Sequence, residues 1–574
     1  MALCVTASAL AGASAPGHML GGHAHGGYGP LVGSTVTLYS VGTTGYGSAA
    51  TSLGSTVTDA SGNFNLPVTC PGNNPLTYLT ATGGKSGGGT VANSGIGLIL
   101  GTGACASIPA TVIINEVSTV ATVYALARFT DATTLDIGAP SSNTVGITNA
   151  FTLIGSLYNP TTGMTGPLYG QPGIPPVSVQ KFNTLADILV SCVNSSSPFA
   201  ACASLFTAAT PPSGPAPTNT DQALFDIAQN PGNNVAAIYA QLALVNGPLP
   251  FTPTLATAPN QWFLGIFHGL GPNAQPEELA VDASGNLYVA DHGGSTGTGG
   301  VIRLTPSGSH TEFSVDASAP FGVAVASDGG IWITNDTNGT LVEYSSTGTV
   351  MAGPVTGLRS PRTVVVDQTG NVWVANTGGN SVLEFSSTGS LLNTITHPSI
   401  LAPFDIAVDA SGHVWSANEA SASISMIAGT TVSSFTRNGV NLPKGIVADA
   451  LGTIWVGNYD ASTRISAFTS VGAPIGNFLV GGTGRVLRLA TDSADNLWAS
   501  DVDTHALTEL SPGGVAISPA AGYISRALNE APQSIAIDPS GNIFVSDLEN
   551  NGVTEYVGAA PPVKTPLIGP ALLP

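Results

Sequence analysis

The sequence predicts a mainly β protein in which a seven-bladed β-propeller follows a small β-sandwich and an α-helical region. Three observations lead to this fold class. A short motif recurs seven times, with starts 44, 41, 42, 40, 43 and 46 residues apart, and periods of about 40 to 50 residues are typical of propellers and solenoids. Only 8% of the residues are charged, which is typical of β-rich secreted proteins. A chain of 574 residues is too long for a single hydrophobic core, so we expect about three structural units.

Each repeat predicts a β-hairpin. An apolar run such as LAVD or IAID leads into an Asp-x-x-Gly turn and continues as a second run of β-branched and aromatic residues. The Asp side chain can bond the turn backbone, and Gly supplies the positive φ that a tight turn needs. The second run is aromatic at one shared position: Tyr288, Trp332, Trp373, Trp415, Trp455, Trp498 and Phe544. Strands that are apolar on both faces fit blades pressed between neighbours.

Further strands complete each predicted blade. A third strand follows the hairpin, as in LVEYSSTG from Leu341 and VLEFSSTG from Val382, and a fourth should end the blade. Residues 262–267 (WFLGIF) precede the first hairpin. We expect them to close the ring by adding an outer strand to the last blade, because closure removes exposed sheet edges.

The repeats resemble the NHL-repeat family, whose blades begin P-x-x-I-A-V-D and continue G-N-x-W-V-A-[DN]. The resemblance covers about residues 275–557 of an expected propeller domain at 260–574. The leading proline is present in six repeats: Pro276, Pro320, Pro361, Pro403, Pro443 and Pro532. The sixth repeat has Val486 in place of the proline and Asp495 in place of the turn glycine. We therefore expect the sixth blade to be the least regular.

Residues 21–85 are expected to form the β-sandwich. The stretch HGGYGPLVGSTVTLYSV from His25 and the later TDASGNFNLPV resemble the transthyretin-like or carboxypeptidase-regulatory module, which is common in exported bacterial proteins. The order of sandwich, helical region and propeller is similar to that of acidobacterial-type exported NHL proteins. The resemblance implies a small sandwich that precedes the repeats.

Residues 86–250 are expected to be α-helical with linkers. Apolar residues recur at spacings of three and four in segments that start at Asn115, Lys181 and Asp221, which indicates helices. Asn115 and Asp221 are the predicted N-caps. Residues 209–220 and 247–259 are rich in Pro and Thr and are predicted linkers.

The chain start and the cysteines favour export. Residues 1–20 are expected to be a signal or leader segment, because the apolar stretch ALCVTASALAGASA closes with Ala-Ser-Ala, as at a signal-peptide cleavage site. Of the five cysteines, the four that follow Cys4 are disulfide candidates: Cys70, Cys105, Cys192 and Cys202. They pair most simply in chain order, although four cysteines allow three connectivities. Disulfides would mean an extracytoplasmic location: secreted, periplasmic or at the cell surface.

The charge balance limits the partners. The 33 acidic and 13 basic residues leave a net charge of −20, which repels nucleic acid and anionic lipid headgroups. Gly, Pro or Ser interrupts every apolar stretch before a membrane-spanning length of about 20 residues accumulates. We expect no nucleic acid and no membrane span, and a protein, peptide or glycan as the partner at the propeller face.

The predicted ligand-binding residues follow the leading position of each repeat. These residues start the innermost strand, near the mouth of the central channel, and they differ in chemistry: Glu277, Phe321, Arg362, Phe404, Lys444, Leu487 and Gln533. Structure alone would not demand that variety inside a repeated frame. Aromatic and charged groups around one concave mouth are what a small-ligand or peptide pocket needs, so we predict the binding surface there.

Other repeated polar residues are interpreted as structural. An Asp or Asn ends the second strand of every repeat, at Asp291, Asn335, Asn376, Asn418, Asn458, Asp501 and Asp547. We expect these side chains to cap loops, because a ligand site would not need all seven. A Glu recurs in the third strand at Glu343, Glu384, Glu509 and Glu555, and it is interpreted as a hydrogen-bonded structural residue.

Two functions remain open. Virginiamycin B lyase and the gluconolactonase-like enzymes use related propellers, and the former relies on channel-facing histidines with a metal. Here the histidines are scattered, with none at the mouth positions: His268, His292, His310, His397, His413 and His505. We therefore predict no catalytic residue, no metal ligand and no cofactor, and an exported, non-catalytic binding protein. The alternative is a propeller hydrolase or lyase with a divalent metal at the channel mouth.

Overall fold

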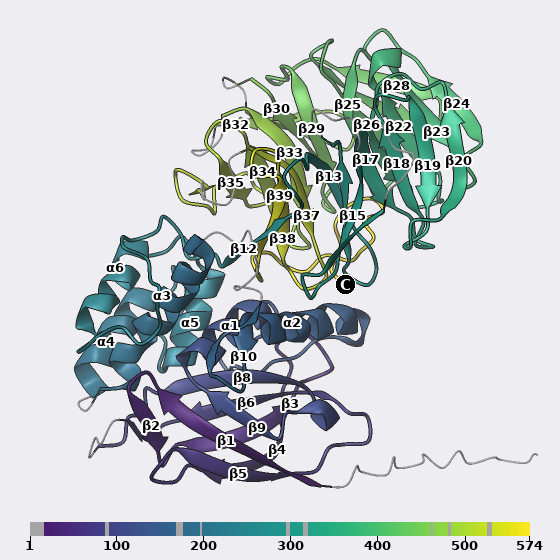
Figure 1. Cartoon of the computed structure of the whole chain (residues 1–574). Helices are drawn as coiled ribbons and strands as arrows, with labels where there is room; N and C mark the ends of the chain where they lie inside the picture. Colours follow the sequence, from purple (N-terminus) through teal and green to yellow (C-terminus); the bar gives the residue numbers. More distant parts are fainter. Residues whose placement is uncertain are drawn as a thin grey trace, which may run out of the picture.

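The computed structural model describes residues 17–86, 91–167, 176–195, 198–293, 299–313, 319–460, 462, 464–479, 484–524 and 531–574. Figure 1 shows the repeats at one end of the molecule and the N-terminal sheets at the other, with helices between them. Most of the expected leader, residues 1–16, lies outside the described residues. None of the helices in these ranges is long and apolar enough to cross a bilayer.

Two β-sheets form the N-terminal end of the molecule. Their strands are β1 (His18–Gly26), β2 (Gly29–Val32), β3 (Thr35–Ser40), β4 (Thr51–Val57), β5 (Asn63–Val68), β6 (Leu76–Thr82), β7 (Lys85–Ser86), β8 (Gly97–Ala104) and β9 (Thr111–Ile114). One sheet has the order β5-β1-β2-β7, with β9 parallel to β1, and the other β4-β3-β6-β8. The sheets begin at residue 18 and continue past residue 85, so the expected sandwich boundaries are too narrow.

Helices cover these sheets on the side that faces the repeats (Figure 1). They are α1 (Glu116–Leu126), α2 (Thr144–Leu157), α3 (Pro176–Val193), α4 (Pro198–Ala209), α5 (Thr220–Gln229) and α6 (Val235–Tyr239). The predicted cap of α1 is confirmed, because the Asn115 side chain accepts from Ser118 N at 2.9 Å. The predicted cap of α5 is wrong. Asn219 accepts from Gln222 N, and Asp221 lies inside the first turn.

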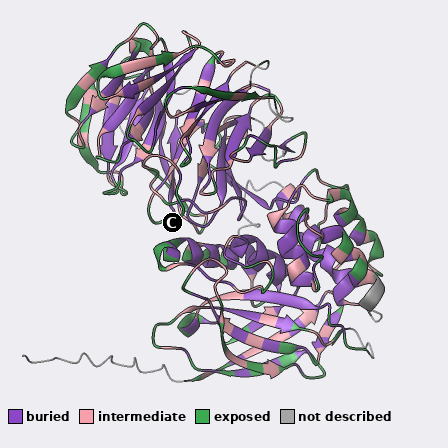
Figure 2. Cartoon of the chain, turned by 180° about the vertical axis from the view of Figure 1, so that it is seen from behind, coloured by how far each residue is buried: buried purple, intermediate pink, exposed green. Residues whose placement is uncertain are grey.

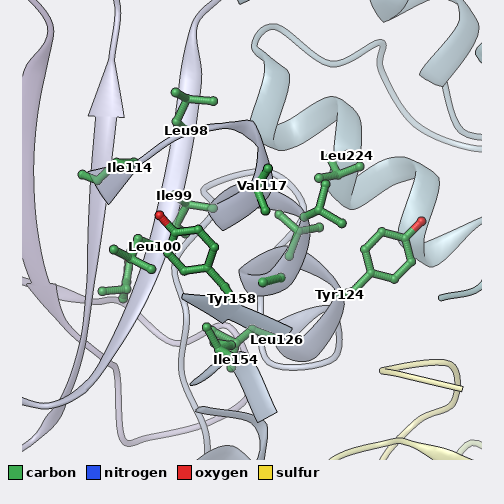
Figure 3. Packing of buried hydrophobic residues seen from close by; sticks show 14 of the residues in the cluster. Leu98, Ile99, Leu100, Ile114, Val117, Tyr124, Leu126, Ile154, Tyr158 and Leu224 are labelled. Carbon is green, nitrogen blue, oxygen red and sulfur yellow. The ribbon is translucent and has the colours of Figure 1, made fainter. Parts of the chain in front are cut away.

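The sheets and helices share one hydrophobic core, although we expected two units. All eleven residues of α1 are buried, as expected for a helix surrounded by other elements. Figure 3 shows Val117, Tyr124 and Leu126 of α1 among residues of β8, α2 and α5. The same cluster includes Trp262 and Ile266 just before the repeats. We refer to residues 17–260 as the N-terminal unit because this core makes it a single body.

The repeats form seven antiparallel four-stranded sheets. The first strands are β13 (Pro276–Val281), β17 (Pro320–Val325), β21 (Pro361–Val366), β25 (Pro403–Val408), β29 (Pro443–Ala448), β33 (Val486–Thr491) and β37 (Pro532–Ile537). The second strands are β14 (Leu287–Asp291), β18 (Ile331–Asn335), β22 (Val372–Asn376), β26 (Val414–Asn418), β30 (Thr453–Asn458), β34 (Leu497–Asp501) and β38 (Ile543–Asp547).

The outer half of each sheet follows the same plan. The third strands are β15 (Gly300–Leu304), β19 (Thr340–Tyr344), β23 (Ser381–Phe385), β27 (Ser423–Ala428), β31 (Ile465–Thr469), β35 (Ala506–Leu510) and β39 (Gly552–Tyr556). The fourth strands are β16 (His310–Phe313), β20 (Val350–Thr356), β24 (Leu391–Ile395), β28 (Thr431–Phe435), β32 (Pro474–Phe478), β36 (Tyr523–Ile524) and β12 (Gly265–Gly269). The short β36 belongs to the sixth sheet, where the sequence departs from the repeat.

The last sheet takes its fourth strand from before the first repeat. β12 pairs with β39 over five residue pairs, as predicted for residues 262–267. Each first strand contacts the first strand of the next sheet, and β37 contacts β13. The second strands of the repeats are buried along nearly their whole length, and Figure 2 shows that much of the propeller is buried. The fold is therefore a β-propeller.

The Asp-x-x-Gly turns lie together at one end of the propeller, which we call the turn face. Four turn aspartates accept a hydrogen bond from the indole N–H of the aromatic residue six positions later. These pairs are Asp367 with Trp373, Asp409 with Trp415, Asp449 with Trp455 and Asp492 with Trp498, at 2.8 to 3.0 Å. One side chain thus holds both the turn and the large aromatic, which explains why the two recur together.

The N-terminal unit covers the turn face at the last and first sheets. Asn143 donates to Pro539 O at 2.8 Å, and Ser540 donates to Gly146 O at 3.0 Å. The half-buried Arg128 donates to the carbonyls of Gly558 and Ala559. The opposite end of the propeller, where the first strands begin, is left free by these contacts.

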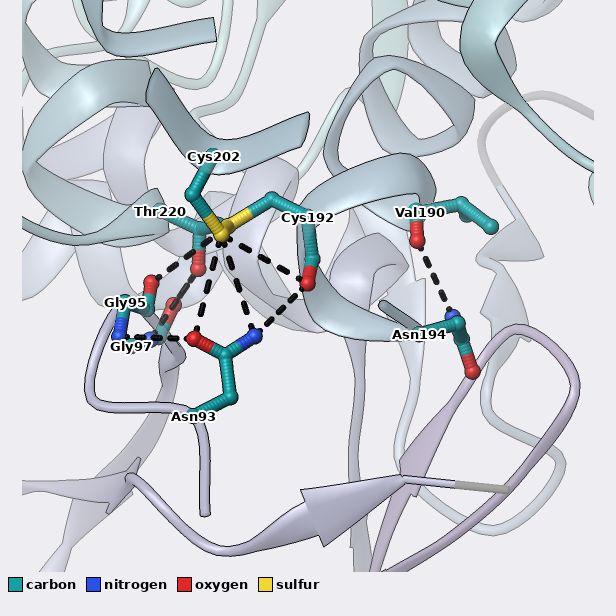
Figure 4. Close-up of a disulfide and its surroundings, with 8 residues drawn as sticks. All are labelled: Asn93, Gly95, Gly97, Val190, Cys192, Asn194, Cys202 and Thr220. Atoms are coloured by element: carbon teal, nitrogen blue, oxygen red, sulfur yellow. Dashed lines mark hydrogen bonds between the residues drawn. A yellow bond between two sulfur atoms is a disulfide. The ribbon is translucent and has the colours of Figure 1, made fainter. Parts of the chain in front are cut away.

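Two disulfides are confirmed with the simplest pairing. Cys70 is bonded to Cys105, and Cys192 is bonded to Cys202. The second disulfide joins α3 to α4 beside Asn93, whose side-chain N–H donates to Cys192 O at 2.8 Å (Figure 4). Both disulfides lie in the N-terminal unit.

Candidate functional site

The residues that follow the leading position stand outside the regular strand pairing. In all seven sheets the register between first and second strands shifts just after the leading residue. Such a bulge re-aims a side chain without disturbing the rest of the sheet. This explains how Glu277, Phe321, Arg362 and their counterparts can differ inside a repeated frame. We call the end of the channel where they lie the mouth.

The structure brings four predicted residues together in a stack. The Arg362 guanidinium lies 4.5 Å from the Phe321 ring centre and 4.7 Å from that of Phe404. Lys444 Nζ lies 4.9 Å from the ring centre of the same Phe404 and 4.1 Å from the ring centre of Tyr459. Cations over aromatic faces at these distances attract the ring quadrupole. Aromatic and cationic side chains therefore alternate around the mouth.

Arg485 extends this cation–aromatic stack to the sixth sheet. Its guanidinium lies 4.7 Å from the Tyr459 ring centre, and its Nη1 donates to the Tyr459 hydroxyl at 3.1 Å. Tyr459 and Arg485 were not predicted, because they lie in loops outside the repeated frame. Their only signal in the sequence is their position, one directly after a second strand and the other directly before a first strand.

A buried ion pair lies beneath the stack. Arg488 Nη1 is 3.5 Å from Asp405 Oδ2 and donates to Lys444 O at 3.1 Å. Its guanidinium is also 5.0 Å from the Phe404 ring. Burial raises the pKa of Asp405, and the Arg488 charge opposes that shift. Sequence reasoning missed Arg488, although its position is Gly, Thr, Ser, Asp or Glu in the other repeats.

Glu278 adds a second carboxyl to this layer. Its Oε2 accepts a hydrogen bond from Val323 N at 3.2 Å. Burial raises the pKa of Glu278 to about 8, although Arg488 acts in the opposite direction. Burial therefore favours the neutral form of this carboxyl, which can donate a proton in a hydrogen bond.

The channel below the mouth is a cavity of about 180 Å³. Glu278, Asp405 and Arg488 line its upper part, and aliphatic side chains of the first strands line the rest. The C-terminal tail closes the other end, since Val563, Thr565, Leu567 and Gly569 also line the cavity. Access from solvent is therefore expected from the mouth.

The remaining predicted residues lie at the edge of the stack. Leu487 packs with Phe321 and Phe404. Glu277 is partly buried, and burial raises its pKa while Arg488 and Arg362 lower it. Gln533 donates to Ala531 O in its own loop at 3.5 Å. The stack itself thus involves Phe321, Arg362, Phe404 and Lys444.

Several of the repeated polar residues have the structural roles that were predicted for them. Asp291, Asn376, Asn458 and Asp547 each accept a hydrogen bond from the backbone N–H of the loop before the first strand, at 2.6 to 3.0 Å. Glu384 accepts from Asn371 and Asn393, and Glu555 accepts from Asn542. These side chains hold the sheets rather than line the mouth.

Two of the histidines lie away from the stack. His268 on β12 bonds Glu555 at 2.8 Å, and His413 bonds the turn residue Asp409 at 3.0 Å. Among the described residues, no three His, Cys, Asp or Glu side chains are grouped to hold a metal ion. At the mouth, Arg488 faces Asp405, and its charge would oppose a divalent cation there. Arg488 and Asp405, among the described residues of the mouth, therefore do not fit a divalent metal site.

Comparison with known proteins gives one family match. Residues 222–404 match the model of the SMP-30/Gluconolactonase/LRE-like region. No curated protein sequence matches significantly. Among solved structures, virginiamycin B lyase from Staphylococcus aureus is similar at 16% identity, over 50% of this chain and 96% of that one, with a TM-score of 0.45.

Other solved structures are similar over the same share of the chain. Kuenenia stuttgartiensis hydrazine synthase has 15% identity and a TM-score of 0.43, over 50% of this chain and 96% of that one. The WD40 β-propeller domain of Doa1 has 11% identity and a TM-score of 0.42, over 50% of this chain and 94% of that one.

Proposed function

We propose that this chain is an exported, non-catalytic binding protein whose mouth recognises a protein, peptide or glycan. The proposal takes the seven sheets as the blades of a closed, NHL-type propeller and the mouth as its recognition surface. The N-terminal sheets, as a transthyretin-like sandwich, and the helices would serve as spacer or docking elements. Two disulfides support an oxidising, extracytoplasmic location.

The cation–aromatic stack carries this proposal. It gathers Arg362, Lys444 and Arg485 at one place in a chain with only 13 basic residues and a net charge of −20. Aromatic and arginine side chains are also the residue types that dominate binding energy at interfaces. The N-terminal unit contacts the turn face, which leaves the mouth accessible to a partner.

Immobilised protein should be tested against peptide and glycan libraries, in the wild type and in a Lys444→Met/Tyr459→Leu double variant. We expect ligands that bind the wild type at least tenfold more tightly than the variant, because the variant loses the centre of the stack. Lys85→Gln is the matched control, since Lys85 is an exposed basic residue of β7. The proposal would be contradicted if every ligand that is found binds the wild type and the double variant equally tightly.

A second candidate, a propeller hydrolase or lyase with a divalent metal at the mouth, is favoured by the gluconolactonase-like match over residues 222–404. It requires metal ligands other than the Arg488-paired carboxylate of Asp405. Metal analysis of the purified protein and thermal unfolding with and without chelator test it. A stoichiometric divalent ion whose removal lowers the melting temperature, together with turnover of a lactone, would favour the enzyme over the binding protein.

A further inference from the structure

We propose that Arg362 anchors a carboxylate group of the ligand, an inference that deepens the proposed function and depends on it. Its guanidinium lies beside two aromatic rings, with the central carbon 4.5 Å from the Phe321 ring centre and 4.7 Å from the Phe404 ring centre. The N–H edge of a guanidinium matches a carboxylate in a two-point arrangement.

The N–H edge of Arg362 has unused donors. Its Nε is buried and makes no hydrogen bond. A buried donor without an acceptor costs free energy, and a guanidinium cannot lose its proton to avoid that cost. An acceptor supplied by a ligand would therefore be bound more strongly here than at an exposed arginine.

The other cations of the stack, and Arg488 beneath it, already have carboxylate partners. Lys444 Nζ lies 3.3 Å from Glu419, Arg485 Nη2 lies 2.6 Å from Asp503, and Arg488 Nη1 lies 3.5 Å from Asp405. No such ion pair involves Arg362 within the described part of the chain. Arg362 is thus the mouth cation with capacity for an external anion.

The surroundings favour a singly charged anion. Three carboxylates lie close enough to Arg362 to raise the pKa of its guanidinium: Asp336, Glu277 and Glu419. Their negative charges would repel a dianion such as phosphate more strongly than a carboxylate. The Phe404 ring beside Arg362 already contacts two cations, Arg362 and Lys444. Little of its surface is therefore left for a neutral sugar ring to stack on. A carboxylate, from an acidic peptide or from a uronic acid glycan, fits best.

Binding of four fluorescent probes to the full chain tests this assignment: a tetraglutamate peptide, a tetraglutamine peptide, a uronate tetrasaccharide and a neutral hexose tetrasaccharide. We expect one acidic probe to bind more tightly than its neutral counterpart, and its identity distinguishes peptide from glycan. Arg362→Met, which keeps the packing against both rings, should weaken that binding by about 10- to 100-fold. The affinity of Arg362→Lys should lie between those of the wild type and Arg362→Met, because Lys keeps the positive charge but lacks the paired N–H donors of a guanidinium.

Two controls separate folding from binding. Lys85→Gln removes one exposed basic residue far from the mouth and should bind as the wild type does. Thermal unfolding of Arg362→Met should stay close to that of the wild type, which shows that the variant is folded. The carboxylate assignment is overturned if neither acidic probe binds better than its neutral counterpart, or if Arg362→Met leaves the preference unchanged. If a neutral ligand is lost only in the Lys444→Met/Tyr459→Leu variant, the mouth binds ligands but Arg362 is not their anchor.

Discussion

The two ends of the propeller differ in whether their side-chain contacts recur from one sheet to the next. At the turn face the same contacts recur, with Asp367, Asp409, Asp449 and Asp492 each bonding an indole N–H. At the mouth the equivalent positions of the sheets differ from one repeat to the next and contact one another across sheets. A side chain that secures its own sheet is expected to recur in most repeats, whereas a surface that recognises a ligand needs different groups in fixed places.

The register shift after each leading residue separates these two roles. Residues of the regular pairing are fixed by their neighbours in the sheet, because a change there disturbs the buried contacts on both faces. Residues at the bulge are free of that constraint. We therefore expect substitutions at the turn face to lower stability and substitutions at the mouth to alter binding.

The largest effect is expected from Asp449→Ala at the turn face. Asp449 is fully buried and accepts from Trp455 Nε1 at 2.9 Å and from Thr453 N at 2.6 Å. Its loss leaves two buried donors unpaired and should lower the free energy of unfolding by about 3 kcal/mol. Urea unfolding followed by tryptophan fluorescence measures it. Lys444→Met, a mouth substitution, should cost less than about 1 kcal/mol, and equal losses in the two variants would remove the distinction between the ends.

The next largest effect is expected in the pH dependence of stability, which should differ between groups at the mouth and groups at the turn face. Burial raises the pKa of Glu278 at the mouth to about 8 from 4.5, and that of Asp538 at the turn face to about 7 from 3.8. The fold therefore favours the neutral form of each, and stability is lost as the pH rises from the unfolded pKa through the folded pKa. Each group contributes a loss of about 1.4 kcal/mol per pH unit inside its window.

Glu278→Gln and Asp538→Asn isolate the two contributions. The difference in unfolding free energy between wild type and Glu278→Gln should change more steeply between pH 7 and pH 8 than the difference between wild type and Asp538→Asn. Urea unfolding from pH 5 to pH 9 measures both differences. Equal windows for the two variants would contradict the higher pKa of the mouth carboxyl Glu278.

The smallest expected effect is a gain at the second repeat. Ala326 stands where six repeats have Asp, and Trp332 lies six residues later, as in the other turns. Ala326→Asp should let the carboxylate accept from the Trp332 indole N–H and raise the free energy of unfolding by about 1 kcal/mol. Ala326→Leu, which cannot accept a hydrogen bond, is the control. If the Asp variant is no more stable than the Leu variant, the repeated Asp is not selected for this bond.

Much of the propeller could be predicted because its signals are local. The recurring Asp, Gly and Trp fix a hairpin within ten residues, and the leading prolines mark the first strands at the correct positions. The outer strand β12 was also predicted, since an unpaired edge requires a partner. The unit boundaries before the repeats were less accurate. β8 and β9 lie beyond residue 85, and a single core joins the sheets to the helices.

The sequence by itself determined which residues repeat and which depart from the repeat, because both are visible in the spacing of the chain. It therefore placed Phe321, Arg362, Phe404 and Lys444 at one end of the propeller. Only the tertiary structure decided that these side chains stack on one another, that Tyr459 and Arg485 join them, and that Arg488 lies beneath. The physical reason is that these contacts join sheets that are about 40 or more residues apart in the chain, and the distances between sheets follow from packing rather than from local sequence.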